Sequence, residues 1–445
     1  MNQNSLLDKS IFALFFSFVL PSVISEVLVG VQGIVDGIFV GNFINANAMS
    51  SINIASPFTQ FILGCTMVVS TGTVSYLGRS LGENDLEKSQ NSFHSAFIGL
   101  GCFALFFTFA GVFFAKPIAL FLGASDVLMK DTILYIRVLS FFIPSIAYML
   151  LFGFVDRLLG KPKYYLFATF SCLITNVFAD FIFIKVLNLN VGGAALATGL
   201  AYFSGLLITI WPIISRHNLI NIYNGHFCKN IFNDILINGS SEGVSYVSTA
   251  ITIFLFNSAF MYFAGESGIA AFAIMSYIGN FTALIMFGVS DGIVSIVSTN
   301  YGAQKFNRVR KTFYIAALIN FIAGIICFLF LKFNNRSLIS AFLDADQDVI
   351  ELAVNGSFYY GISFLFVGFN ILQSGFNTAV GNAFESLLIS GCRGFVFNFI
   401  GIMIFPRFLK LLGVWITFPF SEFSTVIVCL LIMLHKPFLY FKRRN

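Results

Sequence analysis

The chain has 445 residues, of which 58% are hydrophobic and only 10% are charged, and its formal net charge is +5. A soluble globular chain carries about a quarter of charged residues, so this composition excludes a soluble domain with a water-facing surface. The small positive balance gives no indication of nucleic acid as a partner. The apolar residues come in blocks of about 20 residues, the length that crosses a bilayer. We therefore expect an all-α polytopic membrane protein.

Twelve transmembrane helices are predicted, six in each half of the chain. In the first half they lie near residues 10–40, 47–75, 91–115, 130–154, 164–184 and 193–214. In the second half they lie near residues 234–262, 268–298, 312–332, 350–375, 384–405 and 412–435. The longest polar connection separates the halves. We therefore predict a first lobe at 1–214, a cytoplasmic linker at 215–232 and a second lobe at 233–445.

Lys and Arg are distributed unevenly among the predicted loops. With the N-terminus in the cytoplasm, 16 of the 25 fall on the cytoplasmic side and 7 on the outer side. The cytoplasmic set includes the tail residues Lys442, Arg443 and Arg444, whereas Arg137 and Arg393 fall inside predicted spans. Because cytoplasmic loops of membrane proteins are enriched in Lys and Arg, we expect both termini in the cytoplasm and an even number of spans.

An internal repeat relates the two halves. When the sequence is shifted so that Val69 meets Val289, seven positions up to Phe93 meet identical residues, and Gly72 meets Gly292. A shift that is longer by one position aligns Gly160 with Gly381. An even number of helices in each half gives the halves the same topology, related by an axis along the membrane normal. The repeat predicts two pseudo-symmetric six-helix lobes around a central cavity.

Acidic residues inside spans are costly and are therefore candidates for function. The candidates among them are Glu26, Asp36, Asp180, Glu242, Asp291 and Glu422. The alternative is that a nearby hydroxyl or amide satisfies each acid, which then only fixes packing. This alternative has more weight for Glu242, Asp291 and Glu422 than for Asp36 and Asp180.

One group of polar residues in the first half has the chemistry of a cation site. Asn176 and Asp180 are four positions apart and share a helix face. Together with Asp36 and Thr198 they offer oxygen ligands, which suit an alkali cation such as Na⁺ or a shared proton. Pro21 precedes Asp36 in the first helix and weakens it, so that this helix is able to bend.

Other polar residues leave more than one interpretation open. Glu26 lies about 80° around the helix from Asp36. It either faces the cavity and attracts a cationic substrate, or it is a hydrogen-bonded acid between helices. We find no phosphate-binding loop and no Cys pair with metal-ligand spacing. We therefore expect no cofactor, and no metal ion beyond Na⁺ at Asp36 and Asp180.

Several short motifs in this order resemble one transporter family. They are GIVDGIFVG (33–41) after Pro21, LGENDLEK (81–88), DRLLGKPK (156–163), NVFAD (176–180), VGGAALATG (191–199), STNYGAQ (298–304) and GVWITFPFSE (413–422). Each motif alone is weak, but their order and spacing over the whole chain are specific. The chain resembles the MATE family of multidrug and toxic compound extrusion transporters, which belongs to the MOP flippase superfamily.

The resemblance implies a secondary active exporter that works by alternating access. It implies that organic cations leave the cell against a proton or sodium gradient, across the bacterial inner membrane, through a protein that we expect to be a monomer. It also implies that Asp36, Asn176, Asp180 and Thr198 form the cation site of the first lobe, and that the first helix bends at Pro21. Glu242 matches an acidic position of the family in the second lobe.

The sequence departs from this family in the second half. Many relatives carry a Gln-Pro pair in the eighth helix, where this chain has Ile293 and Val294. Asp291 and Glu26 match no family motif, and the tenth predicted helix carries no acid beyond its first turn. We keep Glu26, Glu242 and Asp291 as candidates for a substrate site or a second-lobe site.

Three other functions compete with export. A flippase for a lipid-linked saccharide would become more credible if Arg137 and Arg393 both faced the cavity. An integral membrane enzyme would need clustered acids or a His/Asp pair, and the sequence carries no DDxxD or HxxxxD motif, so we expect no enzyme. A channel fits two lobes with acids at mid-membrane depth less well than alternating access does.

Overall fold

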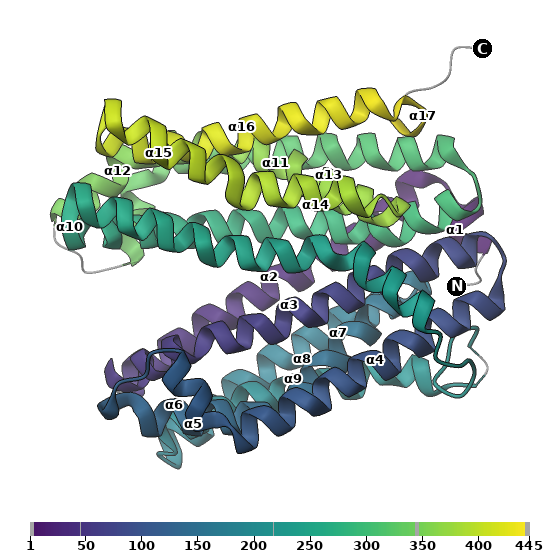
Figure 1. Cartoon of the computed structure of the whole chain (residues 1–445), viewed down its shortest axis with the longest axis horizontal. Helices are drawn as coiled ribbons and strands as arrows, with labels where there is room; N and C mark the ends of the chain where they lie inside the picture. Colours follow the sequence, from purple (N-terminus) through teal and green to yellow (C-terminus); the bar gives the residue numbers. More distant parts are fainter. Residues whose placement is uncertain (1–3, 45, 217, 343–346, 441–445) are drawn as a thin grey trace. The chain divides into compact units, whose positions relative to one another are not determined.

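The structure is a computed structural model that describes residues 4–44, 46–216, 218–342 and 347–440 (Figure 1). The tail residues Lys442, Arg443 and Arg444, which the charge distribution assigns to the cytoplasm, lie outside the described residues. Within these ranges all regular secondary structure is helical. The expected all-α fold class is confirmed.

The helices of the first half follow the chain without large interruptions. They are α1 (Asn4–Asp8), α2 (Ile11–Phe43), α3 (Ala46–Gly82), α4 (Leu86–Phe113), α5 (Ala115–Phe121), α6 (Asp126–Ser140), α7 (Ile143–Leu158), α8 (Pro162–Asp180), the π-helix η1 (Phe181–Val186) and α9 (Asn190–Ile214). The second half holds α10 (Lys229–Gly302), α11 (Phe306–Phe342), α12 (Gln347–Ile362), α13 (Phe364–Val380), α14 (Ala383–Gly391), the π-helix η2 (Cys392–Val396), α15 (Phe397–Leu409), α16 (Leu411–His435) and α17 (Pro437–Tyr440).

The membrane-spanning helices agree with the prediction. Among the described residues, nine helices are long and apolar enough to cross a membrane, and two bent helix pairs raise this number to eleven. The helix α10 has 74 residues and covers two predicted spans, which are divided at Gly265 by a backbone φ of 61°. The described elements therefore accommodate the twelve predicted spans, and the chain is a multi-pass membrane protein.

Two bends within spans were not predicted. The pairs α6–α7 and α12–α13 are each bent by 47°. The first bend lies at Phe141 and Phe142, and the second lies at Ser363. The shift that aligns Gly160 with Gly381 also aligns Phe142 with Ser363. The repeat therefore extends to the place where the helices break, although the residues at the break differ.

The described chain forms two compact units that exchange short helical segments. The first unit comprises Met1–Ser10 and Ile24–Gly239, and the second comprises Ile11–Val23 and Ser240–Asn445. Two helices therefore contribute to both units. The change of unit in α2 comes shortly after Pro21, and the change in α10 comes directly after Gly239.

Glycine residues hold the exchanged segments close to their neighbours. In the first unit, Gly72 of α3 packs against the backbone of Ile235 in α10, and Gly239 packs against the backbone carbonyl of Val68. Nearby, Asn238 donates a hydrogen bond from Nδ2 to Oγ of Ser75 over 2.7 Å. Each glycine brings two backbones closer than a side chain would allow, as small residues do between membrane helices.

The second unit contains the corresponding packing. A methyl group at Gly292 of α10 would lie 2.7 Å from the Cα atom of Val19 in α2, and one at Gly288 would lie 2.5 Å from the Cα atom of Val23. Gly72 and Gly292 are equivalent positions of the repeat. The repeated segment found in the sequence therefore marks the place where each unit accepts a segment of the helix that it shares with the other unit.

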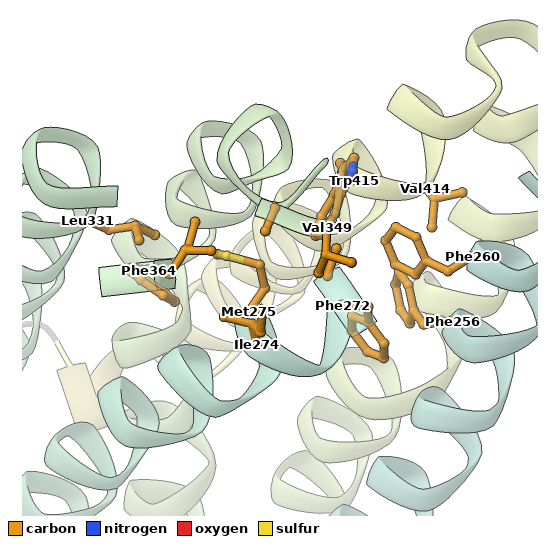
Figure 2. Packing of buried hydrophobic residues seen from close by; sticks show 13 residues of the cluster. Phe256, Phe260, Phe272, Ile274, Met275, Leu331, Val349, Phe364, Val414 and Trp415 are labelled. Atoms are coloured by element: carbon orange, nitrogen blue, oxygen red, sulfur yellow. The ribbon is translucent and has the colours of Figure 1, made fainter. Parts of the chain in front are cut away.

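Aromatic residues dominate the buried core of the second unit. Figure 2 shows Phe256, Phe260 and Phe272 of α10 packed near Trp415 of α16. The ring of Phe256 stacks on that of Phe418 with a centroid distance of 3.9 Å. Such contacts fix the helices around a cavity that is described below.

The connection between α9 and α10 is held on the first unit. The side-chain amide of Gln90 in α4 donates hydrogen bonds to the backbone carbonyls of Asn221 and Asn224 over 2.5 and 2.7 Å. Further along, Asn91 and Ser95 accept hydrogen bonds from the backbone amides of His226 and Cys228. The predicted linker is thus tied to α4 by buried side chains rather than extending freely.

Replacement of Gly72 by Ala tests the close helix packing in the first unit. The added methyl group would fall on the backbone carbonyl of Ile235. We expect the stability to decrease by about 1–3 kcal/mol, the usual cost of overpacking, seen as a lower thermal midpoint of the purified protein in detergent.

The control for this experiment is Gly33→Ala, because a methyl group there meets no atom within 4 Å. We expect this variant to unfold at the midpoint of the unchanged protein or slightly above it. A Gly72→Ala variant that is as stable as Gly33→Ala would contradict the packing argument.

Candidate functional site

The candidate cation site of the first unit joins two helices that are far apart in the sequence. Asp36 comes from the second half of α2, and Asn176 and Asp180 come from the end of α8. The Asp36 carboxyl lies within interaction distance of both the Asn176 and the Asp180 side chains. Asn176 and Asp180 are 0% and 1% exposed. The structure therefore brings together three of the four residues that the sequence assigned to this site.

The polar atoms at this site are only partly satisfied. Oδ1 of Asp36, Oδ2 of Asp180 and both polar side-chain atoms of Asn176 are buried, and no hydrogen bond from the described residues reaches them. Leaving such atoms unpaired costs about 1–3 kcal/mol each. Carboxylate and amide oxygens are ligands for Na⁺, and two neighbouring carboxyls are also able to share a proton. This donor set therefore fits a small coupling cation.

Helix geometry and two tyrosines complete the surroundings of these acids. The wide π-helical turn η1 starts directly after Asp180, and π-helical turns are often found at functional sites. The phenol of Tyr135 in α6 is close enough to interact electrostatically with Asp36 and Asp180, and that of Tyr202 in α9 interacts with Asp36. No periodic signal in the sequence separates these two tyrosines from other aromatic residues.

The other two predicted residues of the first unit, Thr198 and Glu26, lie on α9 and α2. Thr198 is half-buried on α9, a helix that packs against α8. In the described chain no hydrogen bond joins its hydroxyl to Asp36, Asn176 or Asp180. Glu26 on α2 is only 9% exposed and interacts electrostatically with Tyr202. Glu26 therefore faces the interior of the first unit.

In the second unit, a largely buried carboxylate forms an ion pair with an arginine. Nε of Arg393 donates a hydrogen bond to Oε1 of Glu422 over 2.8 Å. The other carboxylate oxygen of Glu422 accepts a hydrogen bond from Nδ2 of Asn370 over 2.7 Å. The sequence singled out Arg393 and Glu422 separately, but they lie on different helical elements and nothing in the pattern joined them.

Two further acids lie beside this pair. Glu242 and Asp291, both on α10, line a small cavity of about 20 Å³ together with Arg393 and several hydroxyl and amide groups. Glu242 interacts electrostatically with both Asp291 and Arg393. The candidates of the second unit therefore form one cluster around Arg393.

The second arginine that the sequence placed in a span lies elsewhere. Arg137 on α6 is exposed, and its Nε donates to the backbone carbonyl of Val112 over 3.2 Å. It lines none of the cavities described in this structure. Of these two arginines, only Arg393 lines a cavity described in this structure, and that cavity lies within the second unit.

The curated relatives of this chain are export proteins. The multidrug export protein MepA of Staphylococcus aureus (strain MSSA476) is 25% identical over 376 residues, which cover 81% of this chain and 82% of the relative. The MepA protein of Staphylococcus haemolyticus (strain JCSC1435) is also 25% identical, over 375 residues, with 81% of each chain covered.

Solved structures with the same fold include MATE transporters. A MATE protein in complex with MaL6 superposes with a TM-score of 0.92 at 21% identity, covering 98% of both chains. An outward-facing multidrug resistance MATE family transporter of the MOP superfamily gives the same values. A MOP superfamily transporter from Pyrococcus furiosus, described as having a binding pocket of reverse polarity, gives a TM-score of 0.91 at 21% identity and 98% coverage of both chains.

The family comparison agrees with the internal repeat. The MatE family matches this chain twice, at residues 21–182 and 243–404. The offset between the two matches is close to the shifts that align Val69 with Val289 and Gly160 with Gly381. Together the matches cover most of the chain, which therefore belongs to the MatE family.

Proposed function

We propose that this protein is a secondary active multidrug exporter that couples the outward movement of organic, mainly cationic compounds to the inward movement of H⁺ or Na⁺. The observation that carries the proposal is the group of buried, unpartnered oxygen atoms on Asp36, Asn176 and Asp180. Membership of the MatE family and the MepA relatives support the export of drugs. From the distribution of Lys and Arg, we propose that both termini lie in the cytoplasm. We also propose that the protein is a monomer in the inner membrane of a bacterium.

The chemistry of the site suggests how an ion would drive the cycle. A cation or proton between Asp36 and Asp180 removes the repulsion of two carboxylates and satisfies atoms that are otherwise unpaired. The ion therefore favours the conformation in which these side chains are close together. A substrate that prefers the other conformation is then released when the ion binds, since a ligand shifts an equilibrium only by its differential affinity.

The first prediction concerns Asp36→Asn. The amide cannot exchange a proton and carries no charge, so ion binding no longer favours one conformation of the protein over the other. In proteoliposomes loaded with the fluorescent cation rhodamine 123, we expect gradient-driven export to fall roughly 5- to 150-fold, the range of typical coupling free energies. A proton gradient and a sodium gradient are imposed separately, and the gradient that drives the unchanged protein identifies its ion.

The matched control is Glu87→Gln, which removes an exposed acid from the first turn of α4. This variant is expected to export like the unchanged protein. Gradient-driven export by a well-folded Asp36→Asn variant would refute the assignment of Asp36. A complete lack of rhodamine 123 export by the unchanged protein under both gradients would point instead to a lipid-linked substrate and to assays of flipping.

A second prediction uses Asp180→Asn alone and in combination with Asp36→Asn. Because the two carboxyls interact directly, they act as one ion site. The double variant is then expected to lose about as much coupled export as either single variant, within roughly a factor of two. Losses that multiply in the double variant, measured in the same proteoliposomes, would show that the two acids serve independent steps.

A third prediction concerns Pro21, which we propose as the bending point of α2. Alanine at this position restores the main-chain hydrogen bond to the carbonyl of Ser17 and stiffens the helix. We expect Pro21→Ala to slow export several-fold while the affinity for rhodamine 123, measured by fluorescence anisotropy, stays unchanged. Pro57→Ala in α3 is the control, and an equal loss in both variants would contradict a special role of Pro21.

A further inference from the structure

An exposed arginine of the first unit is held in place by the end of a neighbouring helix. Nε of Arg137 on α6 donates to the backbone carbonyl of Val112 in the last turn of α4 over 3.2 Å. The last carbonyls of a helix have no partner within it, so this contact also serves α4. Within the described ranges no hydrogen bond or ion pair reaches the two Nη atoms of Arg137. The protein therefore orients the guanidinium and leaves a planar pair of donors open.

The second unit carries a cation at the equivalent place. The shorter of the two shifts that relate the halves pairs Val112 with Lys332, and the longer one pairs Arg137 with Phe358. The ammonium group of Lys332 on α11 lies over the ring of Phe358 on α12, 5.9 Å from its centroid. The same two positions therefore meet in both units, and the cation has moved from one helix to the other.

The backbone supports this equivalence. The helix α4 ends at Phe114 with φ −110° and ψ 22°, and α11 is interrupted at Asn334 with φ −120° and ψ 15°. The shorter shift pairs these two residues as well. Val112 and Lys332 each come two residues before the break. The two cations therefore mark one place in the fold that both units keep.

Helix length places both cations at the level of the lipid headgroups. At 1.5 Å per residue, α4 rises about 39 Å from Leu86 to Val112, and α11 rises equally far from Phe306 to Lys332. The hydrocarbon core of a bilayer is only about 30 Å thick. By the orientation proposed above, these helix ends lie in the outer leaflet.

The surface around each cation is open to lipid. Among the described spans, α4 and α11 have the smallest share of buried residues, 22% each. Phe141, one turn after Arg137, is 62% exposed, and Phe333, next to Lys332, is 74% exposed. Each cation therefore lies beside apolar surface that suits the acyl chains of a lipid whose headgroup reaches the charge.

The charges restrict the class of lipid. In the described chain no carboxylate forms an ion pair with Arg137 or Lys332. The phosphate diester of a phospholipid supplies the missing negative charge, and its oxygen atoms match the donor pair of a guanidinium. A zwitterionic headgroup also brings an ammonium group close to a cation that already lacks a counter-charge. An anionic headgroup avoids this repulsion.

We propose that each unit binds the phosphate of one anionic phospholipid of the outer leaflet, through Arg137 in the first unit and Lys332 in the second. This lipid is a bound constituent of the membrane and not an exported compound, so its binding does not depend on the proposed export function. The guanidinium offers two parallel donors and the ammonium group a point charge. We therefore expect the site of the first unit to bind the lipid more tightly.

The test counts the lipids bound to the purified full-length protein in detergent by native mass spectrometry. The probes are phosphatidylglycerol, which is anionic, and phosphatidylcholine with the same acyl chains. We expect two molecules of phosphatidylglycerol to bind about fivefold more tightly than phosphatidylcholine. Arg137→Gln removes one of these molecules, Lys332→Gln removes the other, and the double variant binds the two lipids equally. All substituted side chains are exposed, so the variants are expected to fold.

Two further variants make the comparison sharper. Val112→Lys/Arg137→Phe gives the first unit the arrangement of the second, and we expect it to keep the preference for phosphatidylglycerol that Arg137→Gln loses. The control is Arg407→Gln, which removes an exposed arginine of α15 that no described contact anchors. We expect this variant to bind both lipids like the unchanged protein.

Three results would overturn the proposal. They are equal binding of the two lipids by the unchanged protein, a preference retained by the double variant Arg137→Gln/Lys332→Gln, and an equal loss in Arg407→Gln. Inorganic phosphate is added as a competitor in a parallel titration. Displacement of phosphatidylglycerol by millimolar inorganic phosphate would assign the two cations to free phosphate and would also refute the lipid sites.

Discussion

The cost of burying charge inside a membrane is the constraint on which the polar architecture of this protein depends. The two units meet it in different ways. In the first unit, Asp36, Asn176 and Asp180 keep buried oxygen atoms that no hydrogen bond from the described residues reaches. In the second unit, Glu422 is neutralised by Arg393, a cation that is part of the chain. One unit therefore keeps buried polar atoms without a described partner, and the other supplies a counter-charge from its own chain.

The backbone follows the repeat more closely than the polar side chains do. The glycines at 72 and 292 serve the same packing role, and both halves bend at equivalent positions, Phe142 and Ser363. Each half also has a π-helical turn beside its polar site, after Asp180 and at Arg393. A shared backbone with different side chains gives a pair of related sites with different chemistry.

The sequence predicted the fold well because hydrophobic length and the repeat are strong, local signals. Spacing along one helix predicted that Asn176 and Asp180 share a face, and the resemblance to the family implied that Asp36 of a distant helix joins them. The position of Tyr135 beside Asp36 and Asp180 depends on which faces of distant helices meet. The pairing of Arg393 with Glu422 depends on the same kind of packing. No spacing within a single segment encodes that information. The bends within spans were not predicted, because only the first of them has a proline next to it as a local signal.

The exchange of helical segments has a consequence for the order of folding during synthesis. The segment Ile11–Val23 leaves the ribosome early, yet the residues that hold it, Gly288 and Gly292, are made only in the second half of the chain. At the usual rates of translation this delay is on the order of tens of seconds. An apolar helical segment therefore waits in the membrane without its native neighbours for most of the time that the ribosome needs to complete the chain. All residues of the first unit exist once Gly239 has been made, whereas the second unit joins a segment made at the start of synthesis to residues made at its end.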